Sequence, residues 1–209
     1  MPACELCETR RPRRHCPGVR GEICAVCCGA EREVTVNCPL DCEYLRDARK
    51  HERLPDLDAA QIPNRDVRVT EGFLQEHEPL LVAVAHALTE AALATPGAID
   101  FDLREALESL VRTYRTLESG LVYESLPANP PAAGIHRHVQ QSVEETRRRL
   151  RERYGMSMVR DAGVLGVLVF LQRLEIRHNN GRKRGRAFLD FLRGNFAQQP
   201  AAGGPLIIR

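Results

Sequence analysis

The stretch GEICAVCCGAEREVTVNCPLDCEYL, residues 21–45, contains five of the eight cysteines of this 209-residue chain. The other three lie before it, at Cys4, Cys7 and Cys16, and no cysteine follows residue 42. Clustered cysteines with C-x-x-C spacing are typical of metal sites, because the short turn brings two thiolates to one ion. The sequence therefore predicts a small metal-binding module over residues 1–53.

Eight cysteines are enough for two complete Cys4 sites, the tetrahedral coordination that structural zinc prefers. Cys27 and Cys28 are adjacent, so their side chains tend to diverge, and we assign them to different ions. The first predicted site consists of Cys4, Cys7, Cys24 and Cys27, and the second of Cys16, Cys28, Cys38 and Cys42. Four thiolates per ion leave no open position for catalysis, which favours two structural Zn²⁺ ions.

An iron–sulfur cluster is the alternative cofactor. Cysteine thiolates also hold such clusters, and Cys16 and Cys38 each precede a proline, although the dense cysteine run of bacterial ferredoxins is missing. A redox pair at Cys27 and Cys28 is a weaker alternative, since a disulfide between adjacent cysteines is strained. Zinc remains the favoured interpretation.

The second half of the module predicts a strand followed by a helix. Val34 and Val36 alternate with polar residues, which favours a short strand. Pro39 suits the first turn of a helix that Cys38 would cap. Thiolates near the start of a helix are stabilised by its dipole. The expected module is thus a knuckle, a hairpin and a helix whose first turn supplies ligands.

This arrangement loosely resembles a treble-clef zinc finger of the cross-braced HIT or MYND type over residues 4–51. The resemblance implies contact with proteins more than the reading of DNA. The chain departs from the pattern of those families, which place a His and a last Cys further into the helix. Here only His51 follows, and it lies too far along the chain to match.

The rest of the chain predicts an all-α helical bundle. Residues 54–69 carry prolines and acidic residues without periodicity and predict a linker. Between residues 70 and 196, apolar residues recur every three or four positions and predict five or six helices. The helix around residues 163–171 is apolar on all sides and is expected at the bundle centre. Residues 123–134 predict a loop, and residues 197–209 a flexible tail.

Charge is unevenly distributed, although the net charge is only +2. Residues 51–134 carry 14 acidic and six basic residues, whereas residues 135–209 carry six acidic and 15 basic ones. Basic residues gather at 147–153 and again at 177–186, and such clusters bind nucleic-acid phosphates. The candidate phosphate-binding residues in the second stretch are Arg177, Arg182, Lys183, Arg184 and Arg186. The competing interpretation pairs these cations with the acidic half of the bundle.

The sequence carries none of the enzyme motifs for phosphate loops, nucleophile elbows or zinc proteases. Its first residues lack the apolar region of a signal peptide, and its longest unbroken apolar run is nine residues, too short to cross a bilayer. We therefore expect a cytoplasmic, non-enzymatic adaptor that binds a protein or nucleoprotein partner and not a membrane. Direct nucleic-acid binding is the alternative function, and an iron–sulfur redox protein is a third.

Overall fold

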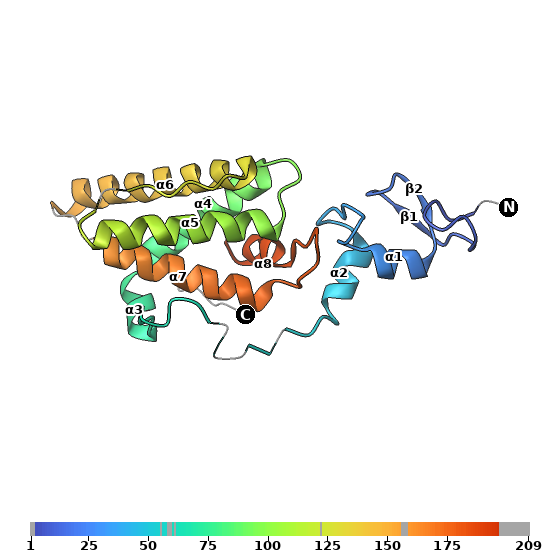
Figure 1. The fold of residues 1–209 in the computed structure, drawn as a ribbon, viewed down its shortest axis with the longest axis horizontal. Helices are drawn as coiled ribbons and strands as arrows, with labels where there is room; N and C mark the ends of the chain where they lie inside the picture. The colour runs from blue at the N-terminus through green and yellow to red at the C-terminus, as the bar shows by residue number, and fades with distance from the viewer. Residues whose placement is uncertain are drawn as a thin grey trace.

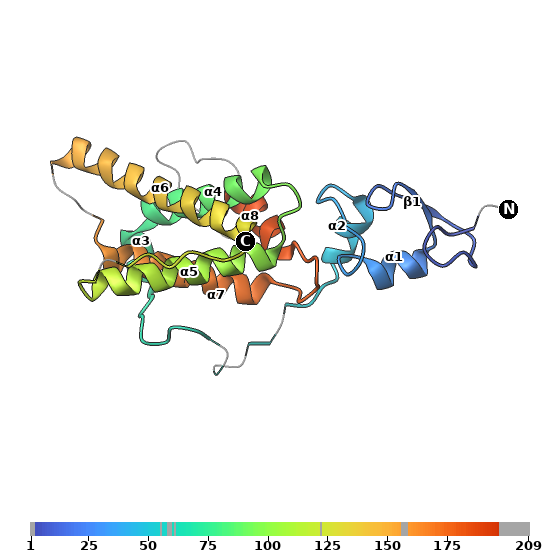
Figure 2. The same cartoon turned by 45° about the horizontal axis from the view of Figure 1, so that its top comes forward.

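The computed structural model describes residues 3–54, 56–57, 60, 62–121, 123–155 and 159–196. Figures 1 and 2 both show a small N-terminal module beyond one end of a helical bundle, with α8 and the end of α7 nearest to it. The predicted tail, residues 197–209, lies outside the described residues. In the part of the chain that is described, no helix is both long and apolar enough to cross a membrane.

The N-terminal module consists of a short hairpin and two short helices. Strands β1 (Arg14–Cys16) and β2 (Gly21–Ile23) pair antiparallel, with Cys16 opposite Gly21. Helix α1 (Ala25–Glu31) follows directly, and α2 (Glu43–Arg49) comes after a loop. The buried cluster of the module contains five cysteines and only three aliphatic side chains, Ile23, Val36 and Leu45.

Two local predictions for this module are wrong. Residues 33–35 form a turn rather than a strand, because the carbonyl of Glu31 accepts hydrogen bonds from the N–H groups of Val34, Thr35 and Val36 and closes the chain after α1. The second helix begins at Glu43 rather than near Pro39. The chain first makes a turn, in which the Cys42 N–H donates to the Pro39 carbonyl.

The predicted helical bundle is confirmed, and six helices form it within the described residues. They are α3 (Glu71–Glu76), α4 (Glu78–Ala94), α5 (Asp100–Glu118), α6 (Pro130–Tyr154), α7 (Asp161–His178) and α8 (Ala187–Phe196). Helix α6 begins within the segment that the sequence predicts as a loop. Proline at the first helical position lacks only an N–H that would be unpaired there, so Pro130 starts the helix rather than preventing it.

Helix α7 lies in the bundle core, as its apolar sequence predicts. Residues 163–169 are all buried, because α7 packs against α5, α4 and α8. Helix α3 covers another side of α7, where Phe73 lies so close to Gly166 that a Cβ at that position would collide with the ring. At the end nearest the module, the carboxylate of Asp100 accepts hydrogen bonds from the N–H groups of Phe188 and Leu189 and so caps α8 (both 3.0 Å).

Candidate metal centre

Two short turns bring together the first cysteine group, defined as Cys4, Cys7, Cys24 and Cys27. Cys24 is the N-cap residue of α1, and its Sγ accepts a hydrogen bond from the backbone N–H of Cys27 (3.4 Å). The backbone N–H of Cys24 in turn donates to the Sγ of Cys4 (3.2 Å). Because N–H groups at a helix start stabilise thiolates, these bonds prepare the sulfurs to receive a cation.

The four sulfur atoms of the first cysteine group lie within 4.8 Å of one another. Three of the four residues are buried and Cys7 is partly buried. Four thiolates at about 2.3 Å from a zinc ion lie roughly 3.8 Å apart, so a small contraction would close the group around a metal. The structure thus brings together the four cysteines that the sequence assigns to one ion, and they can hold one.

The thiols of the first cysteine group differ in proton affinity. A hydrogen bond from the side chain of Thr9, helped by backbone N–H groups, lowers the pKa of Cys7 to about 5. The backbone N–H of Cys27 lowers the pKa of Cys24. The thiol of Cys27 hydrogen-bonds to Cys24, and this bond and burial raise the pKa of Cys27 to about 12. A metal ion would displace the proton of Cys27, because cysteine binds metals as the thiolate.

The second cysteine group, Cys16, Cys28, Cys38 and Cys42, lines one cavity of about 10 Å³, roughly the size of one water molecule. Among the described residues outside the first cysteine group, no three potential ligand atoms of His, Cys, Asp or Glu come within 4.8 Å of one another. The sulfurs of the second cysteine group are therefore more widely spaced than those of the first. The structure places them around a common space without closing them on one point.

One cation and one buried thiol border the cavity of the second cysteine group. The guanidinium of Arg14 lies over the ring of Tyr44, 4.3 Å from its centroid, and donates to the Sγ of Cys28 (3.4 Å). Burial raises the pKa of Cys38, and the charges of Cys16 and Cys42 add to the effect. A divalent cation in the cavity would offset both the free-energy cost of burying charged sulfurs and the repulsion between them.

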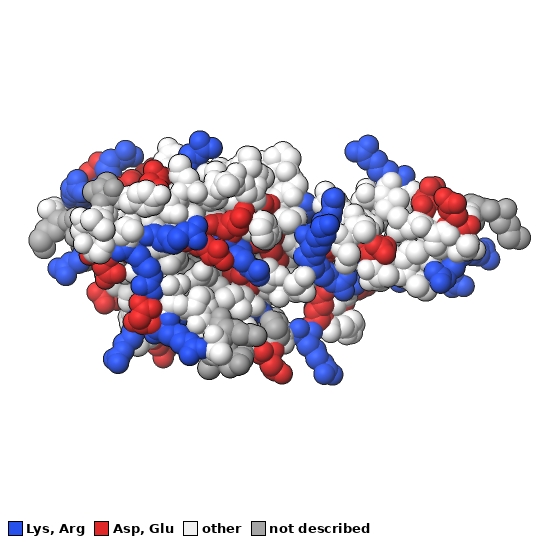
Figure 3. All heavy atoms as spheres, in the orientation of Figure 1, with Lys and Arg blue, Asp and Glu red and all other residues white. Residues whose placement is uncertain are grey.

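The candidate phosphate-binding residues divide into two sets. The side chains of Arg182 and Arg186 are directed into the protein, where Arg182 Nη1 donates to the Arg32 carbonyl (2.6 Å) and Arg186 Nε donates to the Ala98 carbonyl (2.8 Å). The other three residues, Arg177, Lys183 and Arg184, are exposed. Figure 3 shows Lys and Arg side chains at the junction between the bundle and the module. Only this exposed set is free to meet a phosphate.

Three arginines of the other basic stretch, residues 147–153, are engaged with acidic neighbours in their own part of the chain. Arg147 pairs with Glu144 (2.9 Å) and with Asp161 (2.6 Å). Arg148 and Arg149 each lie within 4.0 Å of Glu145. Such i,i+3 and i,i+4 pairs stabilise a helix and reduce the positive potential of this face.

A serine and a histidine form a hydrogen bond inside the bundle core. Ser109 Oγ lies 2.6 Å from His136 Nδ1, and the same hydroxyl donates to the Ala106 carbonyl (2.9 Å). The hydroxyl can donate only one of these two bonds, and the tautomer of His136 decides which one. Both residues are fully buried, and burial lowers the pKa of His136. This pair belongs to the core.

Sequence reasoning missed the residues that join the module to the bundle, Glu33 and Arg49. Glu33 has no exposed surface and forms an ion pair with Arg49 (2.8 Å). The only sequence signal was indirect: an acidic residue stands between the cysteines of a module that is predicted to bind metal. The spacing of apolar residues along the chain does not indicate that Glu33 contacts residues about 150 positions away.

No family model, curated protein or solved structure matches this chain. The resemblance of residues 4–51 to HIT or MYND fingers therefore stays a prediction. The case for a function rests on the chemistry of the cysteine groups and on the surfaces around them.

Proposed function

We propose that this protein is a non-enzymatic adaptor whose N-terminal module is held in shape by two zinc ions and binds a protein or nucleoprotein partner. The first zinc is held by the first cysteine group and the second zinc by the second cysteine group. Each ion has four thiolate ligands, which leaves no coordination position for a substrate or a reactive water. Zinc supplies the folding free energy that the small apolar cluster of the module lacks.

The observation that carries this proposal is a pair of exposed aliphatic side chains, each next to a cysteine of the first cysteine group; their surroundings are called the apolar surface of the module. Each C-x-x-C turn exposes the aliphatic residue that precedes its second cysteine, so Leu6 is 37% exposed and Val26 is 58% exposed. Metal coordination would hold both turns rigid and keep these side chains fixed on the outside. Rigid, exposed apolar side chains rimmed by polar residues are typical of protein contact sites.

A charge at this surface should weaken partner binding. We expect Val26→Glu to lower capture of the physiological partner at least about tenfold, because a buried carboxylate without a partner opposes association. Leu126→Glu is the matched control, since Leu126 is 55% exposed on a loop of the bundle. Quantitative cross-linking of the full, metal-loaded chain in extracts compares the two variants. Equal capture by both variants would argue against the apolar surface of the module as the binding site.

Nucleic-acid binding is the second candidate, because Arg177, Lys183 and Arg184 are exposed close together in the chain. If the adaptor proposal is right, the wild type and Lys183→Ser/Arg184→Ser should bind mixed RNA and DNA equally weakly. The exposed pair Arg112→Ser/Arg137→Ser, which lies outside both basic stretches, is the control. Fluorescence anisotropy over a salt series makes the measurement. A slope of log affinity against log salt reduced by about 1.4 to 1.8 in the first variant alone would favour nucleic-acid binding instead.

A further inference from the structure

The bundle presents a rigid loop, residues 179–186, to the N-terminal module. The side chains of Asn179 and Asn180 fold back and accept hydrogen bonds from the N–H groups of Gly181 (2.7 Å) and Arg182 (3.1 Å). The carbonyl of Gly185 accepts from the N–H of Asp100 at the start of α5 (2.8 Å). These hydrogen bonds hold the loop in place on the bundle without any contribution from the module.

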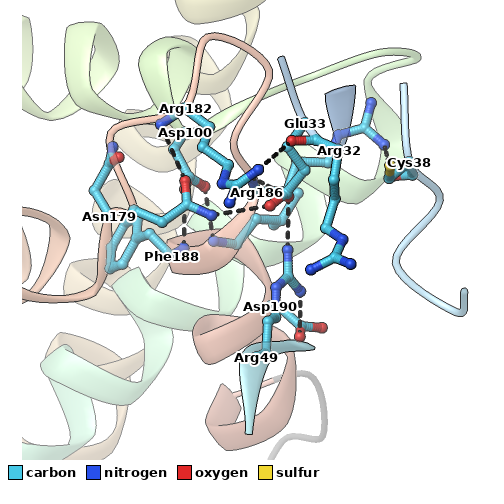
Figure 4. Close-up of polar contacts among 12 residues, drawn as sticks. Arg32, Glu33, Cys38, Arg49, Asp100, Asn179, Arg182, Arg186, Phe188 and Asp190 are labelled. Carbon is cyan, nitrogen blue, oxygen red and sulfur yellow. Dashed lines mark hydrogen bonds and ion pairs between the residues drawn. The ribbon is translucent and has the colours of Figure 1, made fainter. Parts of the chain in front are cut away.

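Glu33 of the module occupies the centre of the contact with this loop (Figure 4). Its Oε1 accepts hydrogen bonds from Arg49 Nη2 (2.8 Å) and from the N–H of Arg186 (2.9 Å), and its Oε2 accepts from Asn180 Nδ2 (2.9 Å). Its backbone carbonyl accepts from the N–H of Arg184 (2.7 Å). A fully buried carboxylate is tolerated only when its oxygens are satisfied in this way.

Further contacts surround Glu33 and connect the same two parts. Arg49 bridges Glu33 to Asp190 of α8. Arg193 of α8 pairs with Asp41 (2.8 Å). Leu40 is buried and belongs to the apolar core of the bundle rather than to the cluster of the module. The module and the bundle are thus joined by polar and apolar contacts, and not only by the chain that connects them.

All the module residues of this junction lie on the segment that the second cysteine group anchors. Arg32 and Glu33 follow Cys28, Leu40 and Asp41 stand between Cys38 and Cys42, and Arg49 lies on α2, which Cys42 caps. The carbonyl of Cys38 itself accepts from Arg186 Nη1 (3.5 Å). By contrast, the hydrogen bonds described above for the first cysteine group stay within residues 4–27.

We infer that the metal ion of the second cysteine group locks the module onto the bundle, whereas the ion of the first cysteine group only shapes the free end. The inference rests on the proposed function, because it requires a metal at the second cysteine group. With that ion bound, the cysteines hold Glu33 and Arg49 where the loop at 179–186 can receive them. Without it, the segment loses its anchors and the module separates from the bundle. Docking of the module on the bundle then raises the affinity of the second cysteine group for its metal ion, and metal binding favours docking by the same factor.

Single cysteine variants separate the two ions. Cys16→Ser and Cys7→Ser should each leave the full chain with one zinc ion fewer by native mass spectrometry. Hydrogen exchange at the N–H groups of Arg184 and Arg186, which donate to Glu33, should accelerate at least about tenfold in Cys16→Ser and stay unchanged in Cys7→Ser. Unchanged exchange in Cys16→Ser after loss of its ion, or equal acceleration in both variants, would overturn the lock while the two-zinc proposal stands. A wild-type chain without a second ion would overturn the two-zinc proposal and the lock together.

The reverse experiment covers the case in which Cys16→Ser unfolds the whole module. Arg182→Ser keeps all eight cysteines but removes the hydrogen bond to the Arg32 carbonyl. It should lower the affinity for one zinc ion at least about fivefold in a chelator titration and leave the other ion unchanged. Arg148→Ser, on α6, is the matched control. Two ions held as tightly as in the wild type would overturn the lock.

Discussion

Cys24→Ser is expected to empty the first cysteine group and to disorder the free end of the module, residues 4–13. Cys4 is the only buried residue in that segment, so no apolar contact replaces the ion. Zinc binding contributes roughly 10 to 16 kcal/mol to the folding of small zinc modules. The three cysteines that remain in the variant would not provide all of this free energy. Native mass spectrometry should find one ion fewer, and hydrogen exchange in residues 4–13 should reach the rate of an unfolded chain.

The control for this experiment is His15→Ala in the same module. The side chain of His15 is 67% exposed and pairs with the exposed Glu22, so its loss should change neither the metal content nor the exchange. Helices α3–α8 should keep their circular dichroism in both variants, because the bundle has its own apolar core. An ordered segment 4–13 in metal-depleted Cys24→Ser would contradict the role of the ion.

Glu33→Ala is expected to lower the free energy of unfolding by about 3 to 5 kcal/mol, the range for removal of one partner from a buried ion pair. The change leaves the nearly buried Arg49 with Asp190 as its one remaining carboxylate partner among the ion pairs described here, and it leaves the amides of Asn180 and Arg186 unpaired. Urea unfolding of the metal-loaded chain measures the loss. The bundle should then unfold separately from the module, as two transitions instead of one.

Glu22→Ala is the matched control for Glu33→Ala. Both are glutamates of the module, but the side chain of Glu22 is 53% exposed, and its removal should cost less than about 0.5 kcal/mol. A loss below 1 kcal/mol in Glu33→Ala would mean that the module is merely tethered to the bundle. Glu33 would then contribute little to the free energy of unfolding, despite its central position in the junction.

The sequence predicts the features that arise from local chemistry or from periodicity. The C-x-x-C spacing and the adjacent Cys27 and Cys28 predicted which four cysteines converge in the first cysteine group. Apolar periodicity predicted the helical bundle and the buried position of α7. These predictions succeed because a helix face, or a tight turn, is specified within a few residues.

The sequence did not predict features that depend on partners far along the chain. Alternating Val34 and Val36 favoured a strand, but the turn that closes α1 overrides that local preference. The basic residues of 177–186 looked alike in the sequence. Yet Arg182 and Arg186 contact the module and the loop before α5, whereas Lys183 and Arg184 are exposed. Composition alone cannot separate a charge that binds within the fold from a charge that faces solvent.

The central claim is that metal ions, not an apolar core, hold the first fifth of this chain in its folded state. Native mass spectrometry of the intact, gently purified chain tests it most directly. The account predicts a colourless protein that carries two zinc ions per chain and loses the order of residues 4–49 when a strong chelator removes them. A metal-free chain whose N-terminal module stays fully ordered and resistant to protease would contradict it.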